Sequence, residues 1–390
     1  MNVFIIPYTF HTFFQYEKRV SGVDEALLKQ IDVLREMGHS VEVYIPFGNL
    51  HEHLTGVHYF KDHVPDEGIK LYLRKQKNKN EILKDILIRM IKFKPDVILS
   101  NAYFQKKLYG ELQKIDSPVV YMSHAIPGFF TDIVSANELG NFIECNSIIA
   151  VSDYHSKRFK KYYERRRTGW TFKNNIDADS IVFSSYSSLE DVQESDGVVR
   201  HVSAAHKEKQ TFLIHDMLSE TEIKSEVYTT LGFMAKDKLK DAYVKKAFEK
   251  YGDGDRKIFL DVDHKDIMEK IKTASCCFVG LASYDTFTIT SLESLSRGVP
   301  IIVKGYKDWH PAKEMLEPEY QKYVHIYKNK ADFIDKVREF SNLTLAERKQ
   351  IAQSCYNVTS KKQYGISLES ALNKSIIKYK EKSKNCLFFQ

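Results

Sequence analysis

The sequence predicts two doubly wound α/β domains, each with a parallel β-sheet covered by helices on both faces. The first observation is length, since 390 residues are too many for one ordinary domain and suit two. The second is an alternation of strands and helices in both halves of the chain. The third is that the expected strands are short apolar runs, as in parallel strands buried on both faces. We expect the domains to face each other across a cleft, with ligands at the carboxyl ends of the strands.

The first half of the chain alternates short apolar runs with amphipathic helices. A helix over 23–37 has apolar residues at helical spacing and stops at Gly38. A second helix over 81–93 ends before Pro95. The expected strands are Val3–Ile6, Val41–Ile45, Val97–Ser100, Val119–Ser123 and Ile148–Ser152.

The second half repeats this pattern. Its expected strands are Val198–Ser203, Val227–Phe233, Ile258–Val262, Cys276–Leu281 and Pro300–Lys304, and its helices fall near 236–250, 264–274, 290–297, 330–341 and 345–355. A final helix over 366–382 has an apolar stripe that needs a partner surface, so we expect it to cross back and brace the first domain. The predicted domains are 1–172 and 173–362, with the crossing helix in 363–390.

Composition restricts the classes of function without choosing one. Hydrophobic residues make up 43% and charged residues 28%, as in folded domains. The formal net charge of +6 is compatible with nucleic acid, an anionic membrane or a phosphorylated ligand. The five cysteines form no CxxC pair and favour a reduced compartment. No apolar run approaches the roughly 20 residues of a membrane-spanning helix. We therefore expect a cytoplasmic protein with no transmembrane segment, with peripheral membrane contact left open.

A loop between an apolar strand and a helix is the first candidate site. Residues 283–298 read SYDTFTITSLESLSRG and place Asp285 and Glu293 eight positions apart. Such a junction directs backbone N–H groups and the positive end of the helix dipole toward a ligand, which favours a phosphate or a sugar hydroxyl. A carboxylate on the loop can accept hydrogen bonds from sugar hydroxyls, and one on the helix can accept two from a ribose diol. The alternative is an ordinary acidic helix turn.

This segment resembles the donor-site signature of the retaining GT-B glycosyltransferases. The signature has an acidic residue, seven further residues, a glutamate, and a small-residue helix followed by Gly-Val-Pro. Glu293 and the run Gly298-Val299-Pro300 match, whereas Asp285 replaces the usual Glu and Thr288 the usual Gly. The resemblance implies two Rossmann-like domains, a ribose contact by Glu293, a catalytic-site contact of Asp285 with the donor sugar, and a donor site that includes Thr286, Phe287 and Thr288.

Four more segments resemble this family in the same order along the chain. Ser21-Gly22-Val23 is similar to the glycine turn near the donor phosphates, which implies donor contacts by Gly22 and Val23, and 38–43 to the second strand. A strand ends in His124, like the active-site histidine of the family. The segments 151–152 and 174–177 resemble the last strand of the first domain and the hinge. His124 has an alternative role as a structural histidine; in the catalytic reading, a ring nitrogen hydrogen-bonds a hydroxyl of the donor sugar.

The expected phosphate clamp matches the family least well. The family presents Arg and Lys, five residues apart, after the first strand of the second domain. Lys209 occupies the Lys position, but Ala204 occupies the Arg position. Arg offers a bidentate fork and Lys only a point charge, so the change is not conservative. Arg200, His206 or Lys207 are the candidates to substitute, and for Lys207 a solvated charged loop is the alternative.

A basic stretch after the last expected strand of the first domain is the candidate acceptor surface. Residues 157–167 read KRFKKYYERRR, with aromatic residues between the charges. Such a face can follow phosphates and stack on bases, it can lie on anionic lipid, or it can be a solvated helix end. The candidates for contact with a DNA backbone are Lys157, Arg158, Lys160, Lys161, Arg165, Arg166 and Arg167.

We therefore predict a retaining transferase that moves a sugar from a nucleotide diphosphate sugar to a hydroxyl acceptor. The donor that we expect is a UDP-sugar. The order of features is similar to that of the DNA α-glucosyltransferases of T-even phages, which suggests hydroxymethylcytosine in double-stranded DNA as acceptor and the host cytoplasm as location. A lipid-linked or polysaccharide acceptor at a membrane is the first alternative, and an inactive GT-B-like binding protein the second. We expect no cofactor and no metal: Asp261-Val262-Asp263 resembles the metal-binding DxD of another glycosyltransferase fold, yet it ends a strand here.

Overall fold

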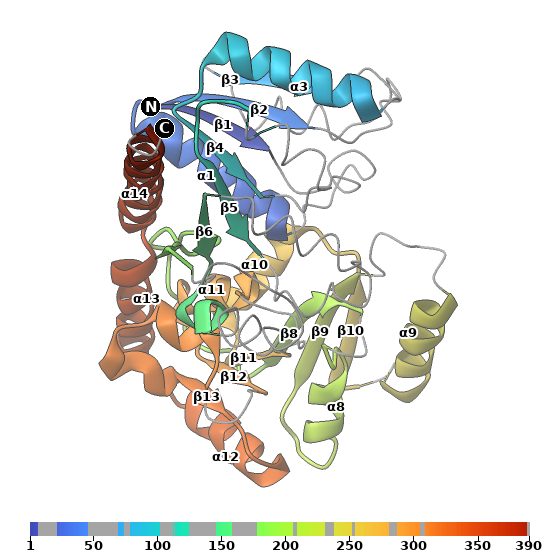
Figure 1. Ribbon diagram of the computed structural model, residues 1–390. Coiled ribbons are helices and arrows are strands. Elements are labelled where there is room, and N and C mark those ends of the chain that lie inside the picture. The colour runs from blue at the N-terminus through green and yellow to red at the C-terminus, as the bar shows by residue number, and fades with distance from the viewer. Residues whose placement is uncertain are drawn as a thin grey trace, which may run out of the picture. The chain divides into compact units, whose positions relative to one another are not determined.

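The computed structural model divides the chain into two compact units, residues 1–185 with 362–390 and residues 186–361 (Figure 1). The first boundary lies at 185 rather than at the expected 172, and the second lies one residue before the expected one. The structure describes residues 1–6, 22–45, 69–73, 79–101, 112, 114–124, 146–157, 178–205, 209–230, 238–251, 254–280, 287–304 and 309–387.

The first unit contains a seven-stranded parallel sheet in the order β3-β2-β1-β4-β5-β6-β7. All five strands expected in this half are present, and β1 is central because Val3 pairs with Val41 on one side and Val97 on the other. The strands β3 and β7 were not expected, because β3 alternates polar with apolar residues and β7 has only two residues. The elements are β1 (Asn2–Ile6), α1 (Gly22–Glu36), β2 (Ser40–Ile45), β3 (Ile69–Leu73), α3 (Lys79–Phe93), β4 (Val97–Ser100), β5 (Val119–Ser123), β6 (Ser147–Ala150) and β7 (Ser180–Ile181).

The last helix, α14 (Lys361–Leu387), belongs to the first unit almost entirely. Its close packing on α1 depends on Gly365, where a Cβ atom would lie 3.0 Å from side-chain atoms of Val33 and Met37. The carboxylate of Glu369 lies 3.1 Å from Nε2 of His39, and Lys378 forms an ion pair with Asp179. These contacts extend from Gly365 to Lys378, so α14 is held to this unit over much of its length.

The second unit contains a six-stranded parallel sheet in the order β10-β9-β8-β11-β12-β13. The helices α8 and α12 contact each other, whereas α11 contacts α10 and α13, so the helices form two groups. The helix α8 and the strand β13 were not expected, because both are short. The elements are β8 (Val199–Ala204), α8 (Leu213–Leu218), β9 (Ser225–Thr230), α9 (Lys238–Tyr251), β10 (Arg256–Leu260), α10 (His264–Thr273), β11 (Cys276–Val279), α11 (Ile289–Leu295), β12 (Ile301–Val303), β13 (Val324–Ile326), α12 (Lys330–Ser341) and α13 (Leu345–Thr359), with 3₁₀ turns at Pro311–Met315 and Pro318–Tyr323.

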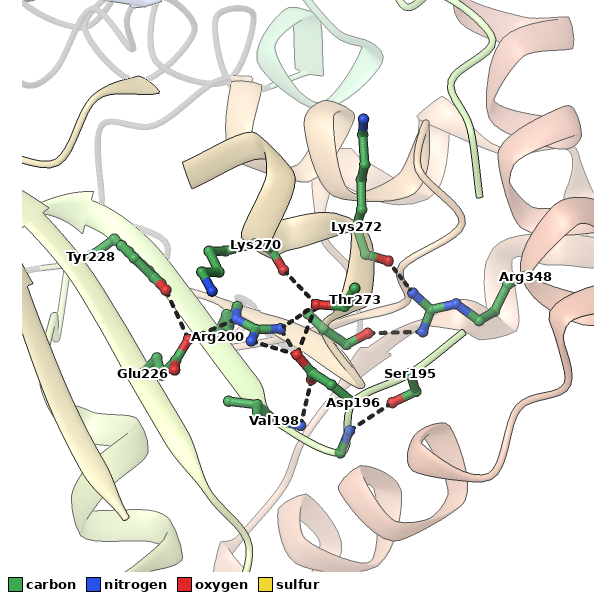
Figure 2. A network of polar contacts seen from close by, with 12 residues as sticks. Ser195, Asp196, Val198, Arg200, Glu226, Tyr228, Lys270, Lys272, Thr273 and Arg348 are labelled. Carbon is green, nitrogen blue, oxygen red and sulfur yellow. Dashed lines mark hydrogen bonds and ion pairs between the residues drawn. The ribbon is translucent and has the colours of Figure 1, made fainter. Parts of the chain in front are cut away.

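A polar network closes the amino-terminal edge of the second sheet (Figure 2). Arg200, near the start of β8, is buried and donates to Glu226 at 2.8 Å and to Asp196 at 2.6 Å. Arg348 of α13 is fully buried, and its guanidinium donates to the carbonyl oxygens of Lys272 and Ala274 at 2.8 Å each. A cation at the carbonyl end of α10 is favourable for the helix dipole, so Arg348 fixes that end of the helix.

Both sheets have one strand order when their strands are counted along the chain, namely 3-2-1-4-5-6, with a seventh strand added in the first sheet. This order places a topological switch point between β1 and β4 in the first unit and between β8 and β11 in the second. In open parallel sheets, the loops on either side of a switch point leave in opposite directions, and ligands generally bind there, at the carboxyl ends of the strands. Within the described residues, no helix is long and apolar enough to cross a membrane.

Candidate functional site

Lys209 lies at the switch point of the second sheet. A Cβ atom on Gly280, the residue after β11, would lie only 1.9 Å from the carbonyl oxygen of Lys209. The backbone of Lys209 therefore passes directly against the end of β11, and only glycine permits that approach. The one signal for this contact in the sequence is a glycine directly after the apolar run of a strand, and we did not expect the contact from it.

A chain of hydrogen bonds lies beneath Lys209 at the end of β8. Nδ1 of the buried His201 donates to the carbonyl oxygen of Phe278 at 2.7 Å, so Nε2 accepts from the hydroxyl of Ser203 at 2.9 Å. The hydroxyl oxygens of Ser203 and Thr211 lie 3.2 Å apart. Burial lowers the pKa of His201 to about 4, against the effect of the Phe278 hydrogen bond, and the positive charge of Lys209 lowers it further. The neutral ring thus fixes the direction of the Ser203 hydroxyl.

The helix α11 begins directly after Thr288, the last of the three consecutive residues expected in the donor site. Phe287 packs against the core of the second unit, and Thr288 precedes the first turn, with its hydroxyl oxygen 2.5 Å from that of Ser291. Thr288 is thus engaged within the turn and is 9% exposed. The other two residues expected to contact the donor here, Asp285 and Thr286, lie outside the described residues.

Glu293 lies on α11, and its carboxylate is held by a histidine. Oε1 of Glu293 lies 2.9 Å from Nε2 of His264, and the Glu293 side chain is 19% exposed. His264 is the first residue of α10, and Asp263 caps that helix by accepting from the backbone N–H of Lys265 at 2.9 Å. The cap gives Asp263 of the DxD-like segment a structural role. His264 was not expected at this site, because the two helices meet only in the tertiary structure.

Gly298, which follows α11, is a second position where glycine is required. Its φ angle is +72°, and a Cβ atom would lie 2.3 Å from the carbonyl oxygen of Arg348. The glycine of the Gly-Val-Pro run thus allows α13 to pack against the end of α11. This packing connects Glu293 to the rigid core of the unit.

The first unit carries a polar cluster at the carboxyl ends of β4 and β5. Nε2 of His124, directly after β5, lies 2.7 Å from Oδ1 of Asn101, directly after β4. Nδ1 of His124 lies 3.4 Å from the hydroxyl oxygen of Ser184. Burial lowers the pKa of His124 to about 4, so the ring is neutral at pH 7. Gly22 and Val23 are the first two residues of α1, as the resemblance to a glycine turn before a helix implies.

One candidate for the phosphate clamp is wrong. Arg200 was one of three residues considered as substitutes for the missing arginine, but it is 3% exposed and paired with two carboxylates near the amino end of β8. Ligands bind at the opposite, carboxyl end. The other two, His206 and Lys207, lie outside the described residues, and Ala204 ends β8.

Little of the basic stretch falls in the described part of the chain. Lys157 is 74% exposed and forms an ion pair with Asp153, one helical turn before it. Such a pair on a helix surface stabilises the fold little. The remaining candidates, from Arg158 to Arg167, lie outside the described residues. Among the described side chains, no group of three or more His, Cys, Asp or Glu residues is placed to hold a metal ion.

Comparison with known proteins reaches this chain only through its structure. No protein-family model and no curated protein sequence matches it. HepE of Anabaena, solved in complex with UDP, superposes with a TM-score of 0.68 at 13% identity, covering 96% of this chain and 100% of that one. The sucrose-phosphate synthase of Thermosynechococcus elongatus gives 0.67 at 11% identity, covering 96% and 98%. TarM of S. aureus gives 0.63 at 8% identity, covering 96% and 100%.

The fold is that of the GT-B glycosyltransferases. The likeness extends over 96% of the chain, so it includes both parallel sheets and the returning helix α14. It agrees with the fold class expected from the sequence. HepE has also been solved with UDP-glucose, and TarM with UDP.

Proposed function

We propose that this protein is a glycosyltransferase that moves a sugar from a UDP-sugar to a hydroxyl acceptor with retention of configuration. The observation that supports this most is the close approach of Lys209 to Gly280 at the switch point of the second sheet. It holds a cationic residue where an α/β sheet of this strand order binds the phosphates of a nucleotide. The GT-B fold supplies the class of reaction.

In the proposed reaction, the bond between the anomeric carbon and the diphosphate oxygen breaks, and the acceptor oxygen forms a bond to the same carbon on the same face. The bond to the diphosphate breaks ahead of the new bond, so negative charge develops on the diphosphate oxygens, which then take up the acceptor proton. Lys209 stabilises that charge, and a fixed cation does so without reorganisation at the moment of reaction. The mechanism requires no protein nucleophile, no metal and no further cofactor, and Asp285 and His124 contact the donor sugar.

Glu293 is the proposed ribose ligand. Its Oε1 is engaged by His264, and a carboxylate has about four lone-pair directions, so the group keeps acceptor capacity for the ribose hydroxyls. The contact with His264 holds the side chain in one rotamer before the nucleotide arrives, which lowers the entropy that binding must overcome.

The test is calorimetric titration of Glu293→Gln with UDP and a panel of UDP- and GDP-sugars. The amide keeps the shape but replaces one acceptor oxygen by a donor, and a charge-assisted hydrogen bond contributes roughly 1.5–3 kcal/mol, so we expect a ten- to hundredfold loss of affinity. Glu269→Gln is the matched control, since it removes an ion pair with Lys272 from the neighbouring helix α10. Equal losses in both variants, or none in Glu293→Gln, contradict the ribose assignment. A wild-type protein that binds UDP but never hydrolyses or transfers from a UDP-sugar is a binding protein.

For the acceptor we propose hydroxymethylated double-stranded DNA, on the basis of the basic stretch 157–167. A cytosine inside a duplex must be flipped out to reach a site at the end of a sheet, and phosphate contacts must offset the few kcal/mol that flipping costs. Incubation of the protein with UDP-sugars and hydroxymethylated DNA, followed by mass spectrometry of the DNA, tests the proposed donor and acceptor together. Transfer to a lipid-linked or polysaccharide acceptor, with salt-independent DNA binding, overturns this choice. The cytoplasmic location stays a prediction from the cysteine usage.

A further inference from the structure

Two buried amides lie behind His124 in the first unit. Asn101 is 2% exposed, and its backbone N–H donates to the carbonyl oxygen of Ile6 at 2.8 Å, which places it at the switch point between β1 and β4. Gln30 of α1 is fully buried beside it. Burying an amide lowers the stability of the fold unless the amide is hydrogen-bonded. Here the amides of Gln30 and Asn101 hydrogen-bond each other.

The amide pair has two possible orientations, and a thioether decides between them. Nε2 of Gln30 donates to Oδ1 of Asn101 at 3.2 Å, and Nδ2 of Asn101 donates to Oε1 of Gln30 at 3.0 Å. Rotating both amides by 180° would leave this reciprocal pair intact. However, the same atom of Gln30 lies 3.1 Å from the sulfur of Met122, which accepts hydrogen bonds weakly and donates none. Gln30 therefore presents its amide nitrogen to Met122. Because that same nitrogen donates to Asn101, the oxygen of Asn101 lies on this side of the pair, where it also faces His124.

The oxygen of Asn101 fixes the tautomer of His124. It lies 2.7 Å from Nε2, and an amide oxygen can only accept, so Nε2 carries the proton. Because burial lowers the pKa of His124 to about 4, the ring is neutral and its Nδ1 has a lone pair. The Ser184 hydroxyl occupies that lone pair at 3.4 Å, a long contact that is easily exchanged for a better donor.

We infer that Gln30 and Asn101 are positioning residues that hold His124 in the Nε2–H tautomer, so that Nδ1 accepts a hydrogen bond from a hydroxyl of the substrate sugar. This inference rests on the proposed transferase function. It assigns a direction to the contact: His124 accepts and the sugar donates. A phosphate or carboxylate group has no proton to give, so the site selects a hydroxyl at this position over an anionic substituent.

The other titratable groups of this cluster leave that arrangement unchanged. His155, after β6, accepts at Nδ1 from the backbone N–H of Val151 at 3.3 Å, so its Nε2 donates to Ser123 at 3.4 Å. Tyr364 of α14 lies beside Gln30, and burial raises the pKa of its hydroxyl against the smaller opposing effect of its hydrogen bond with Gln30. Tyr364 therefore keeps its proton at pH 7.

The first experiment reads the tautomer without using activity. Long-range ¹H–¹⁵N spectra of the whole chain with ¹⁵N-labelled histidine distinguish protonated from unprotonated ring nitrogens, and the spectrum of His124→Gln assigns the His124 signals by difference. We expect a neutral ring with the proton on Nε2 from pH 8 down to about pH 5. A proton on Nδ1 in the wild type overturns the inference.

The second experiment changes the residue that Nε2 faces. Asn101→Asp places a carboxylate beside the ring, and an opposite charge at this distance raises a pKa by about 1–3 units. The imidazolium form then carries a proton on Nδ1 and cannot accept, so turnover of the UDP-sugar should fall as the pH drops through the raised pKa, whereas wild-type turnover shows no such step. Asn101→Leu removes the acceptor and should raise the KM for the UDP-sugar roughly three- to tenfold, the value of one hydrogen bond.

Ser117→Ala is the matched control, since it also removes one buried hydrogen bond of the first unit, to the carbonyl oxygen of Pro95, on the segment before β5. It should leave the His124 tautomer, the pH profile and the KM unchanged. An unchanged pKa of His124 in Asn101→Asp overturns the inference. A wild-type protein that shows the expected tautomer but binds no UDP-sugar contradicts the proposed function instead, so the two failures are distinguishable.

Discussion

Replacing Gly280 by alanine should damage the donor site without changing any charged group. The new Cβ atom would lie 1.9 Å from the carbonyl oxygen of Lys209 and 2.9 Å from its carbonyl carbon. Real contacts to a Cβ atom stay beyond 3.0 Å, so the two segments must separate by about 1.1 Å, the difference between 3.0 and 1.9. Both contacting groups are backbone, so rotation of a side chain cannot relieve the clash.

A shift of this size is large for Lys209 in its proposed role of stabilising developing charge. A misplacement of about 1 Å can cost about a hundredfold in rate. Overpacking in a closely packed region costs roughly 1–3 kcal/mol of stability. We therefore expect a ten- to hundredfold loss of kcat/KM for the UDP-sugar, with a lower free energy of unfolding.

Two variants separate a shift of Lys209 from a general loss of stability. Gly197→Ala, just before β8, forces alanine to a φ angle of +78° with no atom within 4 Å of the new Cβ, at about 1–2 kcal/mol. It should lose similar stability in urea titration and keep full affinity for UDP. Lys209→Gln removes the ammonium group and leaves the backbone contact, and it should weaken UDP binding about tenfold or more. Wild-type UDP affinity in Gly280→Ala, measured by calorimetry, refutes the reasoning.

Three further predictions follow from the same structure and sequence. Arg200→Met leaves Asp196 and Glu226 without their shared cation. The free energy of unfolding, measured by urea titration, should therefore fall by about 3–5 kcal/mol while the affinity for UDP is unchanged. A loss of UDP affinity without a loss of stability would restore Arg200 as a phosphate ligand. Burial, together with the charge of Lys313, lowers the pKa of His310 to about 3. As the pH falls, His310 is therefore protonated near pH 6.5 in the unfolded chain but only near pH 3 in the folded protein. The folded protein loses stability between these two pH values. His310→Asn keeps an acceptor for the backbone N–H of Ala312 and should reduce the slope of unfolding free energy against pH between 6 and 4 by about 1.4 kcal/mol per pH unit; an equal slope in both proteins contradicts the assignment. Replacing Arg165, Arg166 and Arg167 by alanine should weaken DNA binding and flatten its dependence on salt by about 0.9 in log–log slope per lost contact, with UDP-sugar hydrolysis retained, whereas an unchanged slope identifies a solvated face.

The sequence alone determined the architecture, because strand and helix periodicity are local properties. Short apolar runs such as Val97–Ser100 and Cys276–Val279 were expected to be strands buried on both faces and are so, and the helix 264–273 was expected to within one residue. The candidate donor segment was recognisable for the same reason, since Glu293 lies on a short helix and Gly298 follows directly after it, at a fixed distance along the chain. Elements without a strong period, such as β3 and β7, could not be found this way.

Only the tertiary structure decided which side chains meet. The pair of Glu293 with His264 joins residues 29 positions apart on two helices, and Gln30, Asn101 and His124 come from α1 and the ends of two strands. Arg200 shows the converse, since its position in the sequence made it a candidate for the phosphate clamp until strand pairing placed Glu226 beside it. Such contacts depend on strand order and helix packing, which bring distant residues together and leave no mark on the local spacing of the chain.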